Sequence, residues 1–210
     1  MSKELFRKRA IQRLKALSPQ QRRIYSYKVN QKLELLLNLL KPKSILFYLP
    51  LKFEPDIYPL LKKFRKKGVD IYIPFIEGDT FKMVKFRLPL FRSGFGTLES
   101  GNSKMKIKRV DIVIVPVIGI DRSFRRIGLG KGMYDRFFQH LPKRPITIFT
   151  QNLECISKTT ITENHDIRAD YYITPKTKDM KRDVNRNFNR SNSIGYPISY
   201  LHPLSRTFCN

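Results

Sequence analysis

A short stretch in the second half of the chain combines glycines, cations and a carboxylate. It reads Arg125-Arg126-Ile127-Gly128-Leu129-Gly130-Lys131-Gly132-Met133-Tyr134-Asp135-Arg136. Because glycine lacks a Cβ, a loop with three alternating glycines can adopt positive φ angles and bring backbone N–H groups close to a phosphate. Its cations can neutralise phosphate oxygens, and its carboxylate can bind a metal ion. The stretch therefore predicts a site for a triphosphate or a similar anion. The alternative is a tight glycine turn whose charges face solvent.

The segments on either side of this loop, and its flanking charges, favour the first interpretation. The apolar run at residues 110–117 is typical of a buried strand, and the pattern at 133–141 is typical of a helix. A strand, a glycine loop and a helix start would aim the positive end and the free N–H groups of the helix at the anion. The glycine spacing matches neither the G-x-x-x-x-G-K-[ST] of a Walker A loop nor the G-x-G-x-x-G of dinucleotide folds.

The elements that must position this loop alternate between helices and apolar strands. The pattern predicts helices at 2–16, 19–41, 57–67 and 133–141, and strands at 44–49, 69–73, 81–87, 110–117, 146–149 and 171–174. Near-continuous apolar runs such as 44–49 indicate strands that are covered on both faces. We therefore predict an α/β fold of three layers, a mostly parallel sheet with helices on both faces, in a single domain. Pro74 is expected to end the strand at 69–73. Residues 88–108, with turn residues at 93–96 and 100–102, are expected to form a long loop.

Two patterns near the start concern the first two helices. Ser18-Pro19-Gln20-Gln21 is typical of a capped helix start, with proline at the first helical position and glutamine three residues after the cap. Lys3 and Arg7 lie four residues apart, so a helix places them on one face. They belong either to a solvated basic helix or to a pair of cations that reaches over a phosphate.

The chain is strongly basic. Its 42 Lys and Arg outnumber 17 Asp and Glu, which gives a formal net charge of +25. Such an excess implies an anionic partner, whether nucleic acid, a phosphorylated cofactor or an acidic substrate. The two cysteines, Cys155 and Cys209, form no disulfide or metal-binding pattern, and no apolar run approaches the roughly 18 residues that span a bilayer. We expect a cytoplasmic protein without an export signal or a membrane partner. One domain should cover residues 1–175, and residues 176–210 should form a basic, weakly ordered tail.

Taken in order, the motifs of residues 1–175 resemble those of the 5-formyltetrahydrofolate cyclo-ligase (methenyltetrahydrofolate synthetase) family. That family has a Lys-x-x-x-Arg near its start, a Glu after the first strand, a segment of the type Val-Pro-Gly-x-x-Phe-Asp, then Arg-Leu-Gly-x-Gly-x-Gly-Tyr-Tyr-Asp, and an Asp close to the last strand. The corresponding positions here are Lys3 with Arg7, Glu54, Val115 to Asp121, Arg126 to Asp135, and Asp166. The ordered combination carries the resemblance, because each piece alone is weakly specific.

The resemblance implies a fold and a reaction. The family fold is a single α/β layer structure. The family reaction uses ATP with Mg²⁺ to activate the formyl oxygen of 5-formyltetrahydrofolate as a phosphorylated intermediate, after which N10 closes the ring and phosphate leaves. The products are 5,10-methenyltetrahydrofolate, ADP and phosphate. Phosphoryl transfer asks the protein for positioning and charge neutralisation rather than for a covalent nucleophile, so the absence of a Ser-His-Asp or Cys-His set is compatible with it.

The resemblance also implies a role for each matching position. The expected ATP-binding residues are Lys3, Arg7, Arg126, Gly128, Gly130, Lys131, Gly132, Met133 and Tyr134. The expected catalytic residues are Lys131, Arg126 and Tyr134, the expected folate-binding residues are Leu49, Glu54, Met133 and Tyr134, and the expected Mg²⁺ ligands are Asp135 and Asp166. The implied partners are ATP and 5-formyltetrahydrofolate, polyglutamylated forms included, and we expect a monomer. Without the resemblance, the carboxylates at 54 and 166 would be taken as ordinary solvated groups.

Several positions depart from the family pattern. Met133 replaces the first of the paired tyrosines, Leu129 stands where an arginine is frequent, Phe124 replaces a turn glycine, and Ile57 replaces the threonine three residues after the glutamate. Methionine offers an apolar surface to a pterin but no hydroxyl. These departures leave open a family member that binds nucleotide or folate without turnover. The net charge leaves open a nucleic-acid binder, although no RRM, KH, zinc-finger or helix-turn-helix pattern occurs.

Overall fold

The computed structural model describes residues 1–92, 98–102, 107, 109–176 and 180–181. Its helices are α1 (Lys3–Lys15), α2 (Pro19–Leu40), α3 (Tyr58–Lys66) and α4 (Met133–Gln139). Its strands are β1 (Ser44–Leu46), β2 (Asp70–Glu77), β3 (Thr80–Lys85), β4 (Phe91–Arg92), β5 (Leu98–Glu99), β6 (Ile112–Pro116), β7 (Gly119–Ile120), β8 (Arg126–Ile127), β9 (Ile146–Thr150), β10 (Tyr171–Ile173) and β11 (Met180–Lys181). No helix within these ranges is long and apolar enough to cross a membrane. The turn expected at 93–96 lies outside the described residues, as does most of the expected tail.

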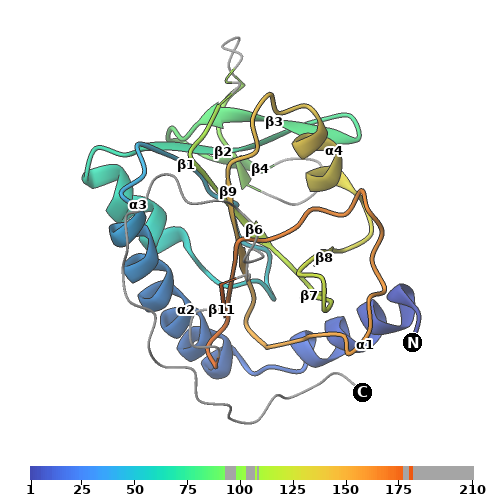
Figure 1. Ribbon diagram of the computed structural model, residues 1–210. Coiled ribbons are helices and arrows are strands. Elements are labelled where there is room, and N and C mark those ends of the chain that lie inside the picture. Colours follow the sequence, from blue (N-terminus) through green and yellow to red (C-terminus); the bar gives the residue numbers. More distant parts are fainter. Residues whose placement is uncertain (93–97, 103–106, 108, 177–179, 182–210) are drawn as a thin grey trace, which may run out of the picture.

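Seven strands form one sheet in the order β11-β10-β9-β6-β1-β2-β3 (Figure 1). The strands from β10 to β2 pair in parallel, whereas the edge strands β3 and β11 pair antiparallel with their neighbours. From β1 the chain moves outward to β2 and β3, and it then returns to place β6 on the other side of β1. The carboxyl ends of β1 and β6 therefore flank the point at which the strand order reverses. Ligands of open α/β sheets bind at such a point.

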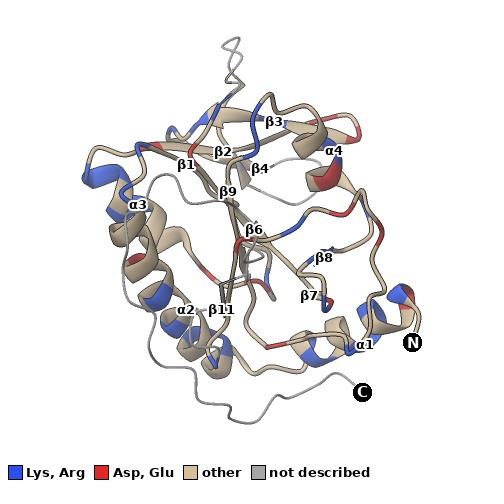
Figure 2. Cartoon of the chain, viewed as in Figure 1, with Lys and Arg blue, Asp and Glu red and all other residues tan. Residues whose placement is uncertain are grey.

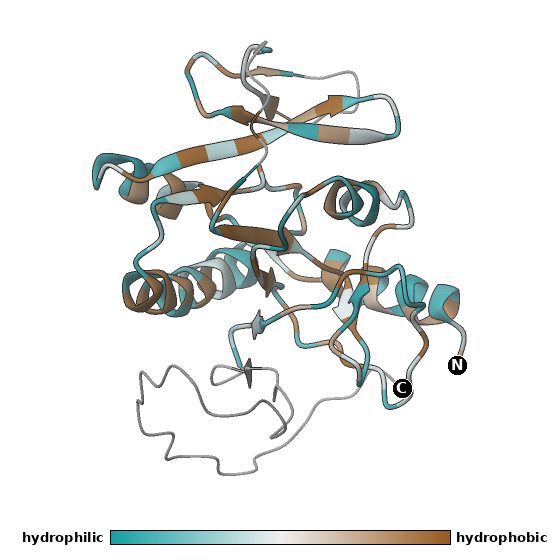
Figure 3. Ribbon diagram, turned by 45° about the horizontal axis from the view of Figure 1, so that its top comes forward, coloured by the Kyte–Doolittle hydropathy of each residue, from teal (hydrophilic) through white to brown (hydrophobic). Residues whose placement is uncertain are grey.

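Alternate residues of the central strands point to opposite faces, and each face has its own apolar core. Ile112 and Ile114 of β6 belong to the core formed with α2 and α3, whereas Val113 and Val115 belong to the core formed with α4. Burial on both faces explains the near-continuous apolar runs of these strands. Hydrophobic residues concentrate on the strands, and the helices alternate hydrophobic and hydrophilic residues (Figure 3). The prediction of a single α/β domain with a mostly parallel sheet and helices on both faces is confirmed.

Helix α1 covers the hairpin formed by β7 and β8 (Figure 1). Phe6 of α1 is fully buried and packs in one cluster with Ile127 of β8. Gly119 of β7 allows this approach, because a Cβ there would lie 2.5 Å from the ring of Phe6 and 2.7 Å from the carbonyl oxygen of Cys155. The packing holds the amino end of α1 beside the hairpin that leads into the glycine loop.

Helix α2 begins, and helices α2 and α3 end, close to the residues that the sequence pattern indicates. Ser18 Oγ accepts a hydrogen bond from Gln21 N at 3.1 Å, and Gln21 Oε1 accepts one from Ser18 N at 2.9 Å, which completes a capping box at the start of α2. Lys41 ends α2 in the left-handed conformation, with φ 46°, just before Pro42. Gly68, with φ 83°, follows α3 in the same way.

The expectation that Pro74 ends its strand is wrong, because β2 continues to Glu77. The pairing of β1 with β2 stops at Tyr72, whose carbonyl accepts a hydrogen bond from Phe47 N. Pro74 lies two residues further on the same side of β2, where β1 offers no further partner. Its missing N–H therefore removes no ladder hydrogen bond.

Short strands are the second difference from the sequence-based expectation. The region expected to be an uninterrupted loop contains β4 and β5, which pair antiparallel, and the segment before the glycine loop contains the β7–β8 hairpin. Two residues are too few to show a hydrophobic period, so no pattern indicates them. At the far edge of the sheet, β11 lies within the range assigned to the tail and pairs with β10.

Candidate functional site

The glycine loop borders a pocket with about 550 Å³ of empty space, part of which is continuous with solvent. The pocket is lined by Lys3, Arg7, Arg126, Gly128, Gly130, Gly132, Asp135, Arg136, Gln139, His165 and Asp166. Arg126 Nε lies 3.5 Å from the carbonyl oxygen of Pro116, the last residue of β6, so the pocket lies at the carboxyl ends of the strands. All the residues expected to bind ATP or metal line this pocket, except Lys131, Met133 and Tyr134.

The loop needs glycine for two different reasons. Gly130 and Gly132 have φ angles of +101° and +63°, in the left-handed region that other residues rarely adopt. At Gly128, a Cβ would lie 2.4 Å from the guanidinium of Arg126. The guanidinium therefore lies against the bare backbone of Gly128, and any side chain at this position would displace a cation of the pocket.

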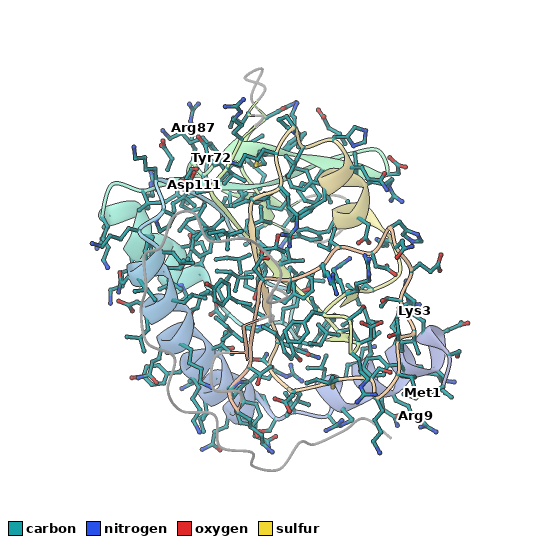
Figure 4. All side chains as sticks on the ribbon, in the orientation of Figure 1. Met1, Lys3, Arg9, Tyr72, Arg87 and Asp111 are labelled. Carbon is teal, nitrogen blue, oxygen red and sulfur yellow. The ribbon has the colours of Figure 1, made fainter. Side chains whose placement is uncertain are left out.

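The two cations of α1 face this pocket. Lys3 Nζ lies 2.5 Å from Oδ2 of Asp166, and Arg7 Nε donates a hydrogen bond to the carbonyl oxygen of Gly128 at 2.8 Å. Figure 4 shows Lys3 near the amino end of α1, far from Asp111 at the start of β6. The helical spacing of four residues thus brings both cations to the same wall, as the sequence predicts.

Asp135 and Asp166 are both buried. Asp135, in the first turn of α4, accepts a hydrogen bond from Ile167 N at 3.1 Å and lies 3.4 Å from Nη1 of Arg126. Asp166 accepts a hydrogen bond from Glu163 N at 2.8 Å. Backbone N–H groups therefore fix both carboxylates at the pocket wall. Mg²⁺ prefers such oxygen ligands and is commonly held by one or two carboxylates together with phosphate oxygens, so the pair fits this ion.

Tyr134 does not line the pocket but contacts Arg126, which does, and Phe81 of the sheet. The guanidinium of Arg126 lies 5.1 Å from the centre of its ring, and Phe81 of β3 packs edge-on against it at 4.9 Å. Burial raises the pKa of the Tyr134 hydroxyl, and the nearby charge of Glu54 raises it further. The hydroxyl therefore stays protonated at neutral pH and can donate a hydrogen bond.

The structure does not bring Lys131 and Met133 into the pocket. The Lys131 side chain is exposed, and its carbonyl oxygen accepts a hydrogen bond from Arg136 at 2.5 Å. Met133 is partly buried and packs against the apolar core on the α4 face, and Thr80 Oγ1 lies 3.4 Å from its carbonyl oxygen. The start of β3 therefore contacts the start of α4.

Glu54 lies in the loop that follows β1, beyond the buried Leu49. Its Oε2 accepts a hydrogen bond from Leu51 N at 2.9 Å. Burial raises the pKa of Glu54 from 4.5 to about 7, although the hydrogen bond from Leu51 and the charge of Arg126 act in the opposite direction. The charge of Arg126 thus acts on Glu54 in the loop after β1 and on Asp135 in the glycine-loop pocket.

Three pocket residues are absent from the sequence-based prediction, namely Arg136, Gln139 and His165. Arg136 and Gln139 follow Asp135 by one and four positions on α4, so helical spacing from Asp135 could have indicated Gln139. Arg136 also forms an ion pair with Asp79 at 3.1 Å and thereby ties α4 to the β2–β3 turn. His165 precedes Asp166 in a segment without a helix or strand, and no pattern indicates that it faces the pocket.

A glycine loop, several cations and two buried carboxylates line a pocket at the reversal point of a mostly parallel sheet, and they place the chain among α/β proteins whose pocket has the groups that suit a polyanion. The chain belongs to the 5-formyltetrahydrofolate cyclo-ligase family, whose model matches residues 1–175. It is 25% identical over 175 residues to the 5-formyltetrahydrofolate cyclo-ligase of Mus musculus, covering 76% of this chain and 86% of that protein. It is 26% identical over 146 residues to the Mycoplasma pneumoniae enzyme of the same name, covering 69% of this chain and 81% of that protein. The NMR structure of Aquifex aeolicus 5,10-methenyltetrahydrofolate synthetase superimposes with a TM-score of 0.74 at 26% identity, covering 90% of this chain and 97% of that chain.

Proposed function

We propose that this protein catalyses the ATP- and Mg²⁺-dependent cyclisation of 5-formyltetrahydrofolate to 5,10-methenyltetrahydrofolate, with release of ADP and phosphate. The observation that carries the proposal is the shared position of Arg126. Its guanidinium lies at the glycine loop and beside Asp135, and its charge also reaches Glu54. A phosphate site and a folate site that meet at one cation suit a transfer of phosphate between two substrates. The names of the mouse and Aquifex relatives support the same activity.

On this proposal, one wall of the pocket binds the ATP phosphates. Lys3, Arg7 and Arg126 supply positive charge, the glycine loop supplies backbone N–H groups, and Lys131 swings in from its exposed position. Asp135 and Asp166 would hold Mg²⁺, which neutralises charge on the phosphate oxygens. The buried surroundings of Arg126, Asp135 and Asp166 strengthen the electrostatic effect of these three groups relative to water.

The folate would lie against Leu49, Glu54 and Tyr134, with Met133 at the edge. The Glu54 carboxylate can accept hydrogen bonds from the N–H groups of a pterin, and the Tyr134 hydroxyl can donate one. The γ-phosphoryl group moves to the formyl oxygen, N10 attacks the activated carbon and loses its proton, and phosphate leaves with the former formyl oxygen. The residues of this chain orient the two substrates and exclude water, and none of them forms a covalent bond with either.

The test is turnover by the purified protein with ATP, Mg²⁺ and 5-formyltetrahydrofolate, followed by the absorbance of the methenyl product. Reactions that lack ATP or contain a chelator are the controls. Absorbance that grows only in the complete mixture supports the proposal. Binding of ATP and folate without product would instead identify a non-catalytic family member, and affinity for DNA or RNA alone would favour the nucleic-acid alternative.

We also propose that the protein acts as a cytoplasmic monomer and accepts polyglutamylated folate. The net charge of +25 supports the last point, because each added glutamate brings another carboxylate.

A further inference from the structure

Asp121, in the turn between β7 and β8, connects two separate segments of the chain. Its side chain is fully buried. Oδ1 accepts hydrogen bonds from Ser123 N at 2.9 Å and Ser123 Oγ at 2.6 Å, and Oδ2 accepts them from Ile161 N at 3.1 Å and Thr162 N at 3.0 Å. Burial alone would raise the pKa of this carboxyl, but the hydrogen bonds from Ser123 and Thr162 lower it below the usual value. Asp121 is therefore a charged acceptor that holds the segment starting at Ile161.

Arg125, at the end of the same turn, holds the other end of that segment. Its Nη1 donates to the carbonyl oxygens of Asn164 and Asp166, both at 2.8 Å, and its Nη2 donates to Oδ1 of Asn164 at 3.2 Å. A single β-bridge then joins Arg125 with Arg168. The planar guanidinium suits this arrangement, because its donors have a fixed geometry.

The segment from Ile161 to Ile167 has no helix or strand of its own. It nevertheless carries Asp166, which lines the pocket, and Ile167, whose N–H donates a hydrogen bond to the Asp135 carboxylate. Its conformation therefore depends on partners outside it, and the turn that contains Asp121 and Arg125 supplies them at both ends.

We propose that Asp121 and Arg125 are positioning residues that hold the segment 161–167 so that Asp166 meets Mg²⁺ in a defined orientation. The inference rests on the metal site of the proposed function and goes beyond it, because neither residue lines the pocket. Groups that orient metal ligands typically change metal affinity by about 10- to 100-fold when they are removed.

The test compares Arg125→Ala with Arg122→Ala, which removes an equal charge from an exposed position of the same turn. ATP binding is measured by calorimetry with Mg²⁺ and with a chelator, and the gain in affinity due to Mg²⁺ is the readout. We expect Arg125→Ala to reduce that gain about tenfold, leaving metal-free ATP binding unchanged, and to speed hydrogen exchange within 161–167. Arg122→Ala should match the wild type in all three measurements.

A second variant guards against simple misfolding. Arg125→Lys keeps the charge but loses the planar guanidinium. This variant should therefore fold, and its gain in ATP affinity due to Mg²⁺ should lie between those of the wild type and Arg125→Ala. Equal loss of ATP affinity with and without Mg²⁺, or an unchanged gain in Arg125→Ala, would overturn the proposal. The variant Asp166→Asn separates a failure of the positioning role from a failure of the metal assignment. If Asp166→Asn removes the gain and Arg125→Ala does not, only the positioning role fails; if Asp166→Asn leaves the gain intact, the metal site fails and the positioning role fails with it.

Discussion

Arg126 is the side chain on which most of the site converges. It lies 3.4 Å from Asp135 and 5.1 Å from the centre of the Tyr134 ring, and it lowers the pKa that burial gives to Glu54. Its guanidinium also occupies the space that a side chain at Gly128 would need. A change at any of these neighbours should therefore alter the position or the charge balance of Arg126.

The loop assignment predicts large rate effects at Asp135 and Lys131. Asp135→Asn keeps an acceptor for Ile167 N but removes the charge beside Arg126, and Lys131→Ala removes a cation that the proposed function brings to the phosphates. We expect each variant to lower kcat by about a hundredfold, because each loses charge in a phosphoryl-transfer site. Initial rates at saturating ATP and Mg²⁺ measure the effect, with thermal melting as the control for folding. Rates like those of the wild type in both variants would contradict the assignment.

Glu54 should make the stability depend on pH. Its pKa is about 7 in the folded protein and 4.5 as an ordinary glutamate, so the folded state binds more protons between these values. The free energy of unfolding therefore falls as pH rises through this window, by at most about 3 kcal/mol, and no further loss comes from this group above it. Urea unfolding at pH 5 and pH 8 measures the change. Glu54→Gln, which cannot titrate, should lose this part of the pH dependence, and an equal slope in both proteins would show that other groups cause it.

At the scale of elements, the conformation of the glycine loop depends on its contact with Arg126 as much as on its own backbone. Gly128→Ala should displace the Arg126 guanidinium, because the new Cβ would lie 2.4 Å from it, whereas Gly101→Ala meets nothing within 4 Å. We expect Gly128→Ala to raise the ATP KM and lower kcat/KM by about tenfold or more. Steady-state kinetics of the two variants test this. Equal, small effects at both glycines would show that Arg126 does not need its observed place.

The elements that could be predicted are those whose signals lie within one turn or one strand. The capping box at Ser18 and the left-handed glycine after α3 are local, and so is the spacing of Lys3 and Arg7. The continuation of β2 through Pro74 depends on where β1 stops pairing, which no local pattern contains. The short strands are likewise produced by their partners rather than by their own two residues.

The predicted site shows the same division between local and distant signals. The glycine loop and the start of α4 are continuous in sequence, so their glycines and Asp135 could be assigned together. The pairing of Lys3 with Asp166 spans 163 positions, and the contact of Arg125 with Asp166 spans 41. The resemblance to a family indicated Asp166 as a site residue, but Arg125 matches no position of the family motifs. The positioning role proposed for Arg125 rests only on the turn that brings it against the segment 161–167.

At the scale of the whole molecule, the pocket accounts for only part of the positive charge. Lys and Arg occur along α1, α2 and α3 and are not confined to the pocket (Figure 2). The formal net charge of +25 produces an attractive field for anions within about 8 Å of the surface at physiological salt. Such a field acts on the approach and binding of an anionic substrate more than on the chemical step.

Polyglutamylated 5-formyltetrahydrofolate should therefore be used more efficiently than the monoglutamate, and rising salt should reduce the difference. Removing residues 182–210 leaves β11 in place and takes away four Arg and one Asp, so it should weaken the preference without changing monoglutamate turnover. The measurement is kcat/KM for both folate forms at low and high salt, in the full chain and in the truncated one. Equal values for the two forms at low salt would exclude the electrostatic role. Loss of monoglutamate activity on truncation would mean that these residues support the folded domain, and steeply salt-dependent DNA or RNA affinity that disappears with them would favour nucleic acid as the partner of this charge.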